Sequence, residues 1–237
     1  MDVTYRILRF NPDTDSAPHY ETYRIEVPDS ATVLDGLQAI KDVQDGTLTF
    51  RRSCRQGICG SCAMRVNDRE RLACNTQISH VADGNELRVE PLANMAVIKD
   101  LAVDMTPFWQ KFNAIVPYTI HAGERPEREY LVSNEKVRHL QQFAGCIQCG
   151  ACYSACPIVG SDPEYLGPAA LAKAYRFVGD PRDAAKKERL GIVGSERGIW
   201  RCHTIFNCTE VCPKGVDPTY AIELLKKATI RRKLGLG

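Results

Sequence analysis

Residues 146–157 read Cys146-Ile147-Gln148-Cys149-Gly150-Ala151-Cys152-Tyr153-Ser154-Ala155-Cys156-Pro157. The spacing is C-x2-C-x2-C-x3-C-P, in which three cysteines hold one iron–sulfur cubane and the fourth reaches to a second cluster. A single run of this kind therefore predicts a partner run elsewhere in the chain. It also predicts that the surrounding segment folds around clusters.

The partner run lies at residues 202–213, where Cys202, Cys208 and Cys212-Pro213 follow the same template. Isoleucine stands at position 205, where the template has its second cysteine. In this arrangement, the last cysteine of each run binds the cluster of the other run. One cluster then has four thiolates and is predicted to be [4Fe–4S], with the ligands Cys146, Cys149, Cys152 and Cys212. The remaining set has three, Cys156, Cys202 and Cys208. Because a cubane short of one protein ligand tends to lose that iron, we predict [3Fe–4S] for this set.

A third group of cysteines lies earlier in the chain and has the plant-type spacing C-x4-C-x2-C with a distant fourth thiol. It predicts a [2Fe–2S] site made of Cys54, Cys59, Cys62 and Cys74. Gly57 and Gly60 would let backbone N–H groups approach the sulfurs, which stabilises an anionic cluster. The three sets together use all eleven cysteines of the chain.

Two other uses of the cysteines, disulfide bonds and a structural zinc site, fit the sequence less well. Disulfides fit poorly, because the count is odd and no signal or transit peptide precedes the N-terminal strand, which indicates a reducing compartment. A structural zinc site would also take four thiolates, but such sites usually use two C-x2-C pairs. Arg51, Arg52 and Arg55 crowd the first group, where they would raise the cluster potential, dock an acidic partner or form a solvated rim.

Composition narrows the class of protein. Of 237 residues, 44% are hydrophobic and 25% charged, as in ordinary globular proteins, and the formal charge of +2 gives no indication of a nucleic-acid partner. No apolar run approaches the roughly 18 residues of a membrane span. We find neither a dinucleotide fingerprint nor a phosphate-binding loop. Two-electron chemistry is therefore expected on partner subunits.

The fold class expected is α+β, with a domain boundary near residue 100. Residues 1–100 show alternating strands at 3–7 and 23–27, a helix capped by Thr32, and short strands at 63–66 and 86–90. This predicts a small α+β domain with a cysteine loop inserted before its last strands. Residues 101–237 indicate a mostly helical domain with two cysteine groups between helices, which open at Thr106-Pro107, Pro168 and Asp217-Pro218.

These features resemble the iron–sulfur subunit of the succinate dehydrogenase and fumarate reductase family, the respiratory complex II family, over nearly the whole chain. The resemblance rests on the three cysteine groups and on flanking segments such as Arg9-Phe10-Asn11-Pro12, Asp100–Met105 and Leu166-Gly167-Pro168-Ala169. It implies a plant-type [2Fe–2S] ferredoxin-like (β-grasp) domain in residues 1–100, followed by an all-helical ferredoxin domain in residues 101–237. It also implies a flavoprotein partner with covalent FAD, one or more membrane anchor subunits with or without heme b, and a quinone. Electrons would run from FAD through [2Fe–2S], [4Fe–4S] and [3Fe–4S] to the quinone, in an enzyme of the tricarboxylic acid cycle.

The resemblance also implies a quinone site beside the three-iron cluster and a peripheral location on the cytoplasmic face of the cell membrane. The matching quinone-site positions are Pro157, His203, Ile205 and Ser161. His203 has a second interpretation, as a hydrogen-bond donor to the cluster. Many succinate dehydrogenases have Trp where this chain has Ser161, and the surrounding stretch looks more like fumarate reductases. Arg201-Cys202-His203 favours succinate oxidation, so the direction stays open.

Overall fold

A computed structural model describes residues 1–124 and 126–236, and they form two compact units. The first contains Met1–Met105 together with Ile147–Ala155, and the second contains Thr106–Cys146 and Cys156–Gly237. The first unit is a sheet domain and the second is helical, in agreement with the fold class predicted from the sequence.

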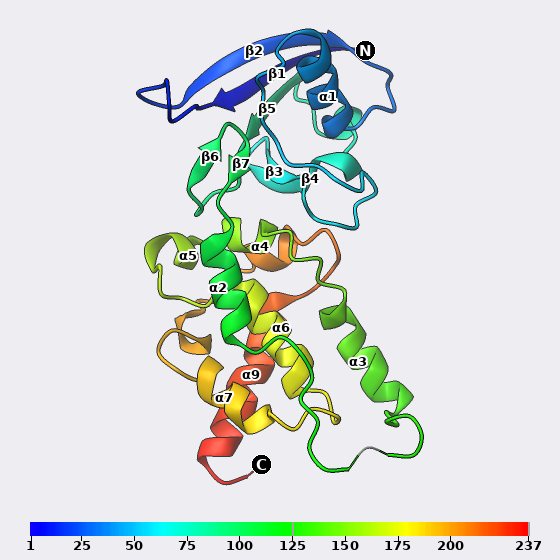
Figure 1. Cartoon of the computed structure of the whole chain (residues 1–237), viewed down its shortest axis with the longest axis vertical. Helices are drawn as coiled ribbons and strands as arrows, with labels where there is room; N and C mark the ends of the chain where they lie inside the picture. Colours follow the sequence, from blue (N-terminus) through cyan, green and yellow to red (C-terminus); the bar gives the residue numbers. More distant parts are fainter. Residues whose placement is uncertain (125, 237) are drawn as a thin grey trace. The chain divides into compact units, whose positions relative to one another are not determined.

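A five-stranded mixed sheet forms the first unit (Figure 1). Its strands, in the order β2-β1-β5-β3-β4, are β1 (Asp2–Arg9), β2 (His19–Glu26), β3 (Ala63–Val66), β4 (Arg69–Leu72) and β5 (Glu86–Glu90). β1 and β2 form an antiparallel hairpin, and β1 pairs in parallel with β5. Val3, Tyr5 and Ile7 alternate into the core, which is the pattern that predicted β1.

Helix α1 (Val33–Val43) covers the core of this sheet. Thr32 caps it as predicted: its hydroxyl accepts from the Asp35 N–H, and the Asp35 carboxylate accepts from the Thr32 N–H. Val33, Leu37 and Ile40 are fully buried. The Tyr5 hydroxyl donates to the Val33 carbonyl at 3.2 Å. A Cβ at Gly36 would lie 2.1 Å from that hydroxyl oxygen, so the contact requires glycine.

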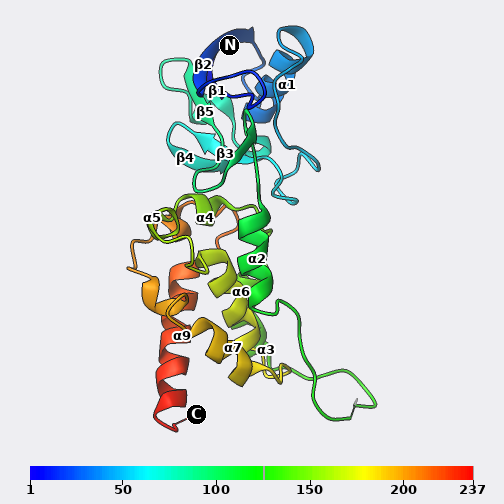
Figure 2. The same cartoon turned by 60° about the vertical axis from the view of Figure 1, so that its left-hand side comes forward.

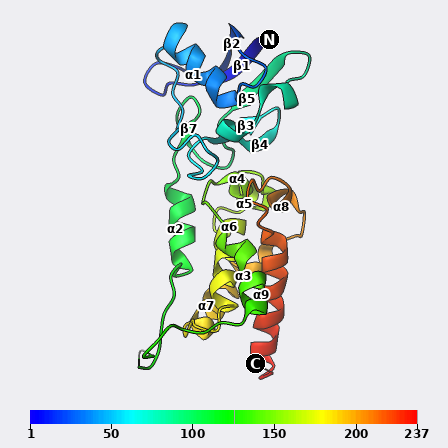
Figure 3. The ribbon, with the colours of Figure 1, turned by 90° about the vertical axis from the view of Figure 1, so that its right-hand side faces the viewer.

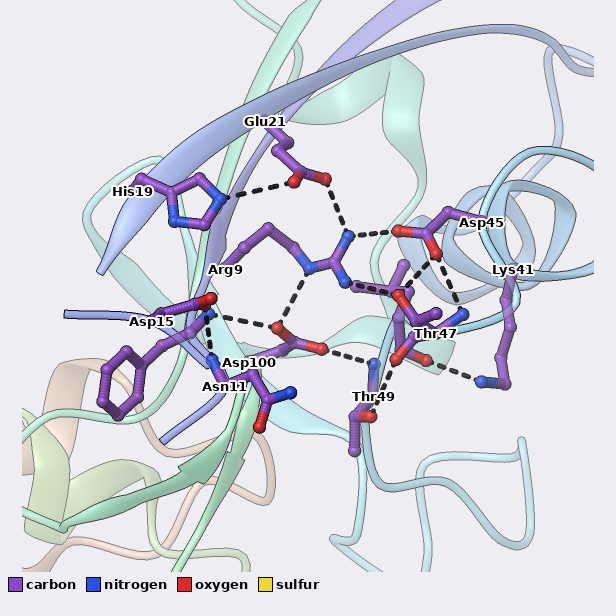
Figure 4. A network of polar contacts seen from close by, with 12 residues as sticks. Arg9, Asn11, Asp15, His19, Glu21, Lys41, Asp45, Thr47, Thr49 and Asp100 are labelled. Atoms are coloured by element: carbon purple, nitrogen blue, oxygen red, sulfur yellow. Dashed lines mark hydrogen bonds and ion pairs between the residues drawn. The ribbon is translucent and has the colours of Figure 1, made fainter. Parts of the chain in front are cut away.

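Arg9 joins distant parts of the first unit through its guanidinium (Figure 4). Nε donates to Asp100 Oδ1 at 3.0 Å, and Nη1 donates to Glu21 at 2.8 Å and also to Asp45. Asp100 in turn accepts from the backbone N–H of Thr49 at 2.9 Å. The last residue of β1 thus fixes the turn between the hairpin strands β6 (Val97–Lys99) and β7 (Ala102–Val103). Arg9 and Asp100 are 6% and 2% exposed, so each depends on the other's charge.

The segment Ile147–Ala155 joins the first unit through the short helix α4 (Ala151–Ser154). The Ser154 hydroxyl donates to the buried Glu70 carboxylate at 2.7 Å and accepts from the Ala93 N–H at 2.8 Å. Asn94 donates to the Ser154 carbonyl at 2.8 Å. These bonds satisfy polar groups that would otherwise be buried without partners.

The second unit is built around α6 (Pro168–Val178), which contacts α2, α3, α7 and α9 (Figure 2). Those helices are α2 (Thr106–Ala114), α3 (Asn134–Ala144), α7 (Lys186–Val193) and α9 (Pro218–Lys233), and the shorter ones are α5 (Pro157–Ser161) and α8 (Asn207–Glu210). Small residues let α6 pack closely, since Ala169, Ala170, Ala172 and Ala174 are all buried. No helix in the described ranges is long and apolar enough to traverse a bilayer.

Arg189 in α7 is fully buried and faces the equally buried Asp183 side chain at 2.8 Å. Its remaining donors reach the backbone carbonyls of Ile115, Val116 and Tyr118. Asp183 also accepts from the N–H groups of Ile120 and Ala185. Every polar atom of this ion pair therefore has a partner, which a buried charge requires.

Several elements match the sequence-based predictions and others do not. The strands at 63–66 and 86–90 and the helices opening at Pro168 and Asp217-Pro218 are confirmed. α2 begins at Thr106 itself, one residue earlier than a Thr106 cap would place it. The structure also contains β4, the β6–β7 hairpin, α3 and α7, for which the sequence pattern gave no prediction.

Candidate iron–sulfur sites

The loop from Cys54 to Cys62 folds so that backbone N–H groups point at cysteine sulfurs. The Cys59 N–H lies 3.3 Å from Cys54 Sγ, the Gly57 N–H lies 3.2 Å from Cys74 Sγ, and the Cys74 N–H lies 3.4 Å from Cys62 Sγ. Burial raises the pKa of Cys62 to about 12, whereas the Ser61 hydroxyl and nearby N–H groups lower that of Cys59 to about 6. The loop thus gathers the four cysteines predicted for the [2Fe–2S] site.

Gly60 has a further role that the sequence did not suggest. Its φ is +73°, and a Cβ there would lie 2.8 Å from Cys149 Cβ and 2.9 Å from the Ile147 carbonyl oxygen. The first cysteine loop and the segment 147–155 therefore approach each other within the first unit. Arg51 lies beside both: burial lowers its pKa, and the Cys149 and Cys62 charges oppose that lowering.

The predicted [4Fe–4S] ligands come from both units. Cys149 and Cys152 belong to the first unit with α4, and Cys146 and Cys212 belong to the second. Gly150, at φ +85°, turns the chain between Cys149 and α4. Lys173 of α6 lies near Cys146, whose charge opposes the lowering of the Lys173 pKa by burial. This set stays a prediction.

The cysteines predicted to hold [3Fe–4S] meet in one recess of the second unit. Cys156 precedes α5, Cys202 follows a short turn at Ile199–Arg201, and Cys208 lies in α8. All three border one recess, together with Tyr165 and Thr219. Figure 3 shows α8 beside the first turns of α9. The arrangement supplies three thiolates and places Ile205 on the recess wall.

The predicted quinone-site residues divide into two groups. Pro157, His203 and Ile205 line the same recess as the three cysteines, and the Ile205 side chain is 47% exposed. Ser161 lies at the end of α5, where its hydroxyl donates to the Ile158 carbonyl at 3.3 Å. Among the residues that the structure describes, those that line the recess do not include Ser161. The structure therefore brings three of the four together.

The residues present fit iron–sulfur clusters. Clusters need thiolates held by short loops whose N–H groups face the sulfurs, and both the 54–74 and the 156–208 sets provide such donors. Across residues 1–124 and 126–236, no three His, Cys, Asp or Glu side chains form a site for a single metal ion.

The sequence alone did not predict that Tyr165 and Thr219 lie at this site. Tyr165 is 1% exposed and Thr219 is 2% exposed, and both border the three-cysteine recess. Tyr165 stands directly before Leu166-Gly167-Pro168, and Thr219 stands seven positions after Cys212. Proximity in sequence to these segments was the available signal, but hydroxyl side chains near a motif are too common to single out.

Related proteins match this chain over nearly its whole length. The fumarate reductase iron–sulfur subunit of Escherichia coli O6:H1 is 43% identical over 223 residues, covering 94% of this chain and 91% of that protein. The mitochondrial succinate dehydrogenase (ubiquinone) iron–sulfur subunit of Dictyostelium discoideum is 41% identical, covering 94% and 81%. A chain of the Mycobacterium smegmatis Sdh1 complex in the apo form superposes with a TM-score of 0.87 at 28% identity, covering 98% and 97%.

Two family models match separate parts of the chain. A 2Fe–2S iron–sulfur cluster binding domain matches residues 4–110, and a 4Fe–4S dicluster domain matches residues 142–216. The sheet domain, the helical domain and their cysteine sets define an iron–sulfur protein that transfers electrons. With relatives above 40% identity over nearly its full length, the chain belongs to the family of iron–sulfur subunits of fumarate reductases and succinate dehydrogenases.

Proposed function

We propose that this chain is the electron-transfer subunit of a membrane-bound succinate:quinone oxidoreductase. Residues 1–100 would carry the [2Fe–2S] cluster and residues 101–237 would carry [4Fe–4S] and [3Fe–4S], on the cysteine sets given above. Each cluster, when bound, takes up and releases one electron at a time. The chain's own residues hold the clusters, exclude water from them and set their potentials. The dicarboxylate chemistry belongs to a partner subunit.

The observation that carries this proposal is the three-cysteine recess. Cys156, Cys202 and Cys208 border it, and isoleucine stands at position 205 where a fourth thiolate would complete a cubane. A three-iron cluster at the end of a chain of clusters suits transfer to an acceptor bound at the exposed wall. Pro157, His203 and Ile205 form that wall, so we assign the quinone contact to them, with Ser161 as an outer member.

The partners follow from the names of the relatives, which are subunits of larger enzymes. We propose a flavoprotein with FAD as the electron donor, and one or more membrane anchor subunits, with or without heme b, beside the quinone. The chain itself would be peripheral, on the cytoplasmic face of the membrane. The exposed apolar residues Ile205 and Phe206, 47% and 48% exposed, support contact with an anchor at the recess.

A quinol:fumarate reductase running in reverse is the second candidate. It is favoured by the stretch around Ser161 and by relatives that carry the fumarate reductase name. Both directions use the same clusters, so comparison of succinate oxidation by quinone with fumarate reduction by quinol in the purified complex decides between them. A higher kcat/KM for the second reaction would replace the first assignment.

Electron paramagnetic resonance of the purified complex tests the cluster assignment. The air-oxidised complex should give a [3Fe–4S] signal, and the reduced complex should add [2Fe–2S] and [4Fe–4S] signals. Iron analysis should return about nine iron atoms per chain, the sum of the three cluster types. Zinc in place of iron, or an absent oxidised signal, would overturn the proposal.

Substitution at position 205 sharpens the test. Ile205→Cys should complete a four-thiolate set, remove the oxidised [3Fe–4S] signal and give a second cubane of lower potential. Ile205→Val is the matched control, since it changes the side-chain volume without adding a ligand and should keep the signal. An unchanged oxidised signal in Ile205→Cys would count against Cys156, Cys202 and Cys208 as the ligands.

A further inference from the structure

The three cysteines of the recess each receive a different kind of hydrogen-bond donor. Cys156 accepts from the backbone N–H groups of Ile158 and Val159 at the start of α5. Cys208 Sγ lies 3.4 Å from the Thr219 hydroxyl oxygen. Cys202 is hydrogen-bonded by the Tyr165 side chain. Two of the three sulfurs therefore depend on side-chain hydroxyls, which mutation can remove one atom at a time.

Thr219 is placed so that its proton is available to the sulfur. It lies in the first turn of α9, directly after the cap Asp217-Pro218, and is 2% exposed. Thr209 Oγ1 lies 3.2 Å from Thr219 Oγ1 and 2.7 Å from Asp217 Oδ1. Because a carboxylate is the stronger acceptor, the Thr209 proton goes to Asp217. The Thr219 proton has two acceptors in reach, Thr209 Oγ1 and Cys208 Sγ, and the charged thiolate is the stronger of them. Thr219 therefore donates to Cys208, with a smaller contribution from the Thr209 side chain.

Tyr165 is a donor for a different reason. Tyr165 is 1% exposed and lines the recess together with all three cysteines. A phenol ionises only at about pH 10, so Tyr165 keeps its proton at physiological pH. The Tyr165 hydroxyl is therefore the donor of its hydrogen bond with Cys202.

We propose that Thr219 and Tyr165 set the reduction potential of the cluster held by Cys156, Cys202 and Cys208, by donating hydrogen bonds to two of its thiolates. A proton directed at a ligand sulfur withdraws electron density and stabilises the more negative, reduced cluster. Loss of either donor therefore lowers the potential. The inference rests on the proposed function, because it requires a cluster at this site.

Redox titration of the oxidised [3Fe–4S] signal in the purified complex tests the proposal. Thr219→Val keeps the shape of the side chain and removes the donor, Thr219→Ser keeps the donor, and Tyr165→Phe keeps the ring. Thr229→Val is the matched control: Thr229 lies on the same helix, is 2% exposed, and its hydroxyl has no hydrogen-bond partner in the described structure.

The expected result is a lower midpoint for Thr219→Val and for Tyr165→Phe, with wild-type midpoints for Thr219→Ser and Thr229→Val. The reduction equilibrium should change on the order of tenfold for each donor lost, which is 59 mV for a one-electron couple. An intact signal with an unchanged midpoint in both donor variants would overturn the proposal. Where Thr219→Val fails to assemble the cluster, Tyr165→Phe decides by the same criterion. A wild-type complex without any [3Fe–4S] signal would instead refute the proposed cluster assignment on which this inference rests.

Discussion

Arg189 illustrates how single buried charges organise the helical unit. Its guanidinium is fully buried and holds Asp183 together with the backbone carbonyls of Ile115, Val116 and Tyr118. These carbonyls follow α2, where the chain leaves the helix and cannot satisfy them itself. One side chain of α7 therefore fixes the end of α2 and the turn at Asp183 at the same time.

Arg189→Met should destabilise the protein strongly. Methionine fills much of the volume but leaves the Asp183 carboxylate buried without its counter-charge, which costs about 3–5 kcal/mol. For a chain of this size the thermal midpoint should fall by on the order of 10 °C. Differential scanning calorimetry measures it. Arg197→Met is the control, because Arg197 and Glu164 form an exposed pair that contributes little. Equal midpoints for the two variants would contradict this account.

Asp180 provides a prediction about pH. The side chains of Arg182 and Arg176 donate to it at 2.8 Å and 2.7 Å and hold the pKa of its carboxyl well below the usual range. A lowered pKa in the folded state gives stability that is present above the unfolded pKa of about 3.9 and is lost as pH falls through the folded value. The difference in thermal unfolding midpoint between wild type and Asp180→Asn should thus stay constant from pH 8 to pH 5 and become smaller below about pH 4. If this difference in midpoint already disappears between pH 8 and pH 6, a group other than Asp180 causes the pH dependence.

At the scale of elements, the sequence predicts those that carry their own start signals. Thr32 with Asp35, and Asp217 with Pro218, are caps that need no tertiary information. α7 has no such signal: Ala185 precedes it without a side-chain cap, and its first residues are Lys186, Lys187 and Glu188. Its burial depends on Arg189 finding Asp183 and distant carbonyls, which no local pattern encodes.

The cysteine sites show the same division. Spacing assigns ligands because a cluster imposes a regular pattern on the chain, and the recess indeed gathers Cys156, Cys202 and Cys208. Donors such as Tyr165 and Thr219 reach the sulfurs from other elements, α9 among them. Their spacing from the cysteines follows the path of the fold rather than a motif, so only three-dimensional structure identifies them.

The contact between α1 and β1 makes a prediction about a helical glycine. Gly36→Ala would normally favour a helix by up to about 1 kcal/mol. Here the new Cβ would lie 2.1 Å from the Tyr5 hydroxyl, so we expect a net loss of about 1–3 kcal/mol from overpacking. Gly191→Ala in α7 is the control: its nearest neighbour would be Arg232 Nη1 at 3.7 Å, and it should stabilise the protein.

Thermal melts of both variants, and of the double variant Gly36→Ala with Tyr5→Phe, measure these effects. Removal of the hydroxyl should recover part of the loss, because the atom nearest the new Cβ disappears. A stabilised Gly36→Ala variant would show that α1 can move away from the sheet without cost.

At the scale of the whole molecule, the two units should depend on iron to different degrees. The five-stranded sheet and α1 have an apolar core of their own, including Tyr5, Leu37 and Leu87. α5 and α8, beside the three cysteines, have five and four residues, too short to persist unaided. Removal of the clusters should therefore unfold α5 and α8 first.

Hydrogen exchange before and after iron chelation tests this expectation. Amides of 158–161 and 207–210 should lose protection, while those of β1 and β5, paired from Thr4 and Glu86 to Ile7 and Val89, should keep it. Full protection of both short helices in the iron-free protein would mean that packing alone maintains the recess.

The bond from Ser154 to Glu70 has a consequence for synthesis on the ribosome. Glu70 is buried in the sheet domain, yet its hydroxyl partner is translated eighty-four residues later. At about 5–20 residues per second, a nascent chain waits several seconds between the two events. During that interval the Glu70 carboxylate lacks the hydrogen bond that the Ser154 hydroxyl donates to it in the folded protein. Because the first unit includes Ile147–Ala155, its fold is complete only after about two-thirds of the chain has been synthesised.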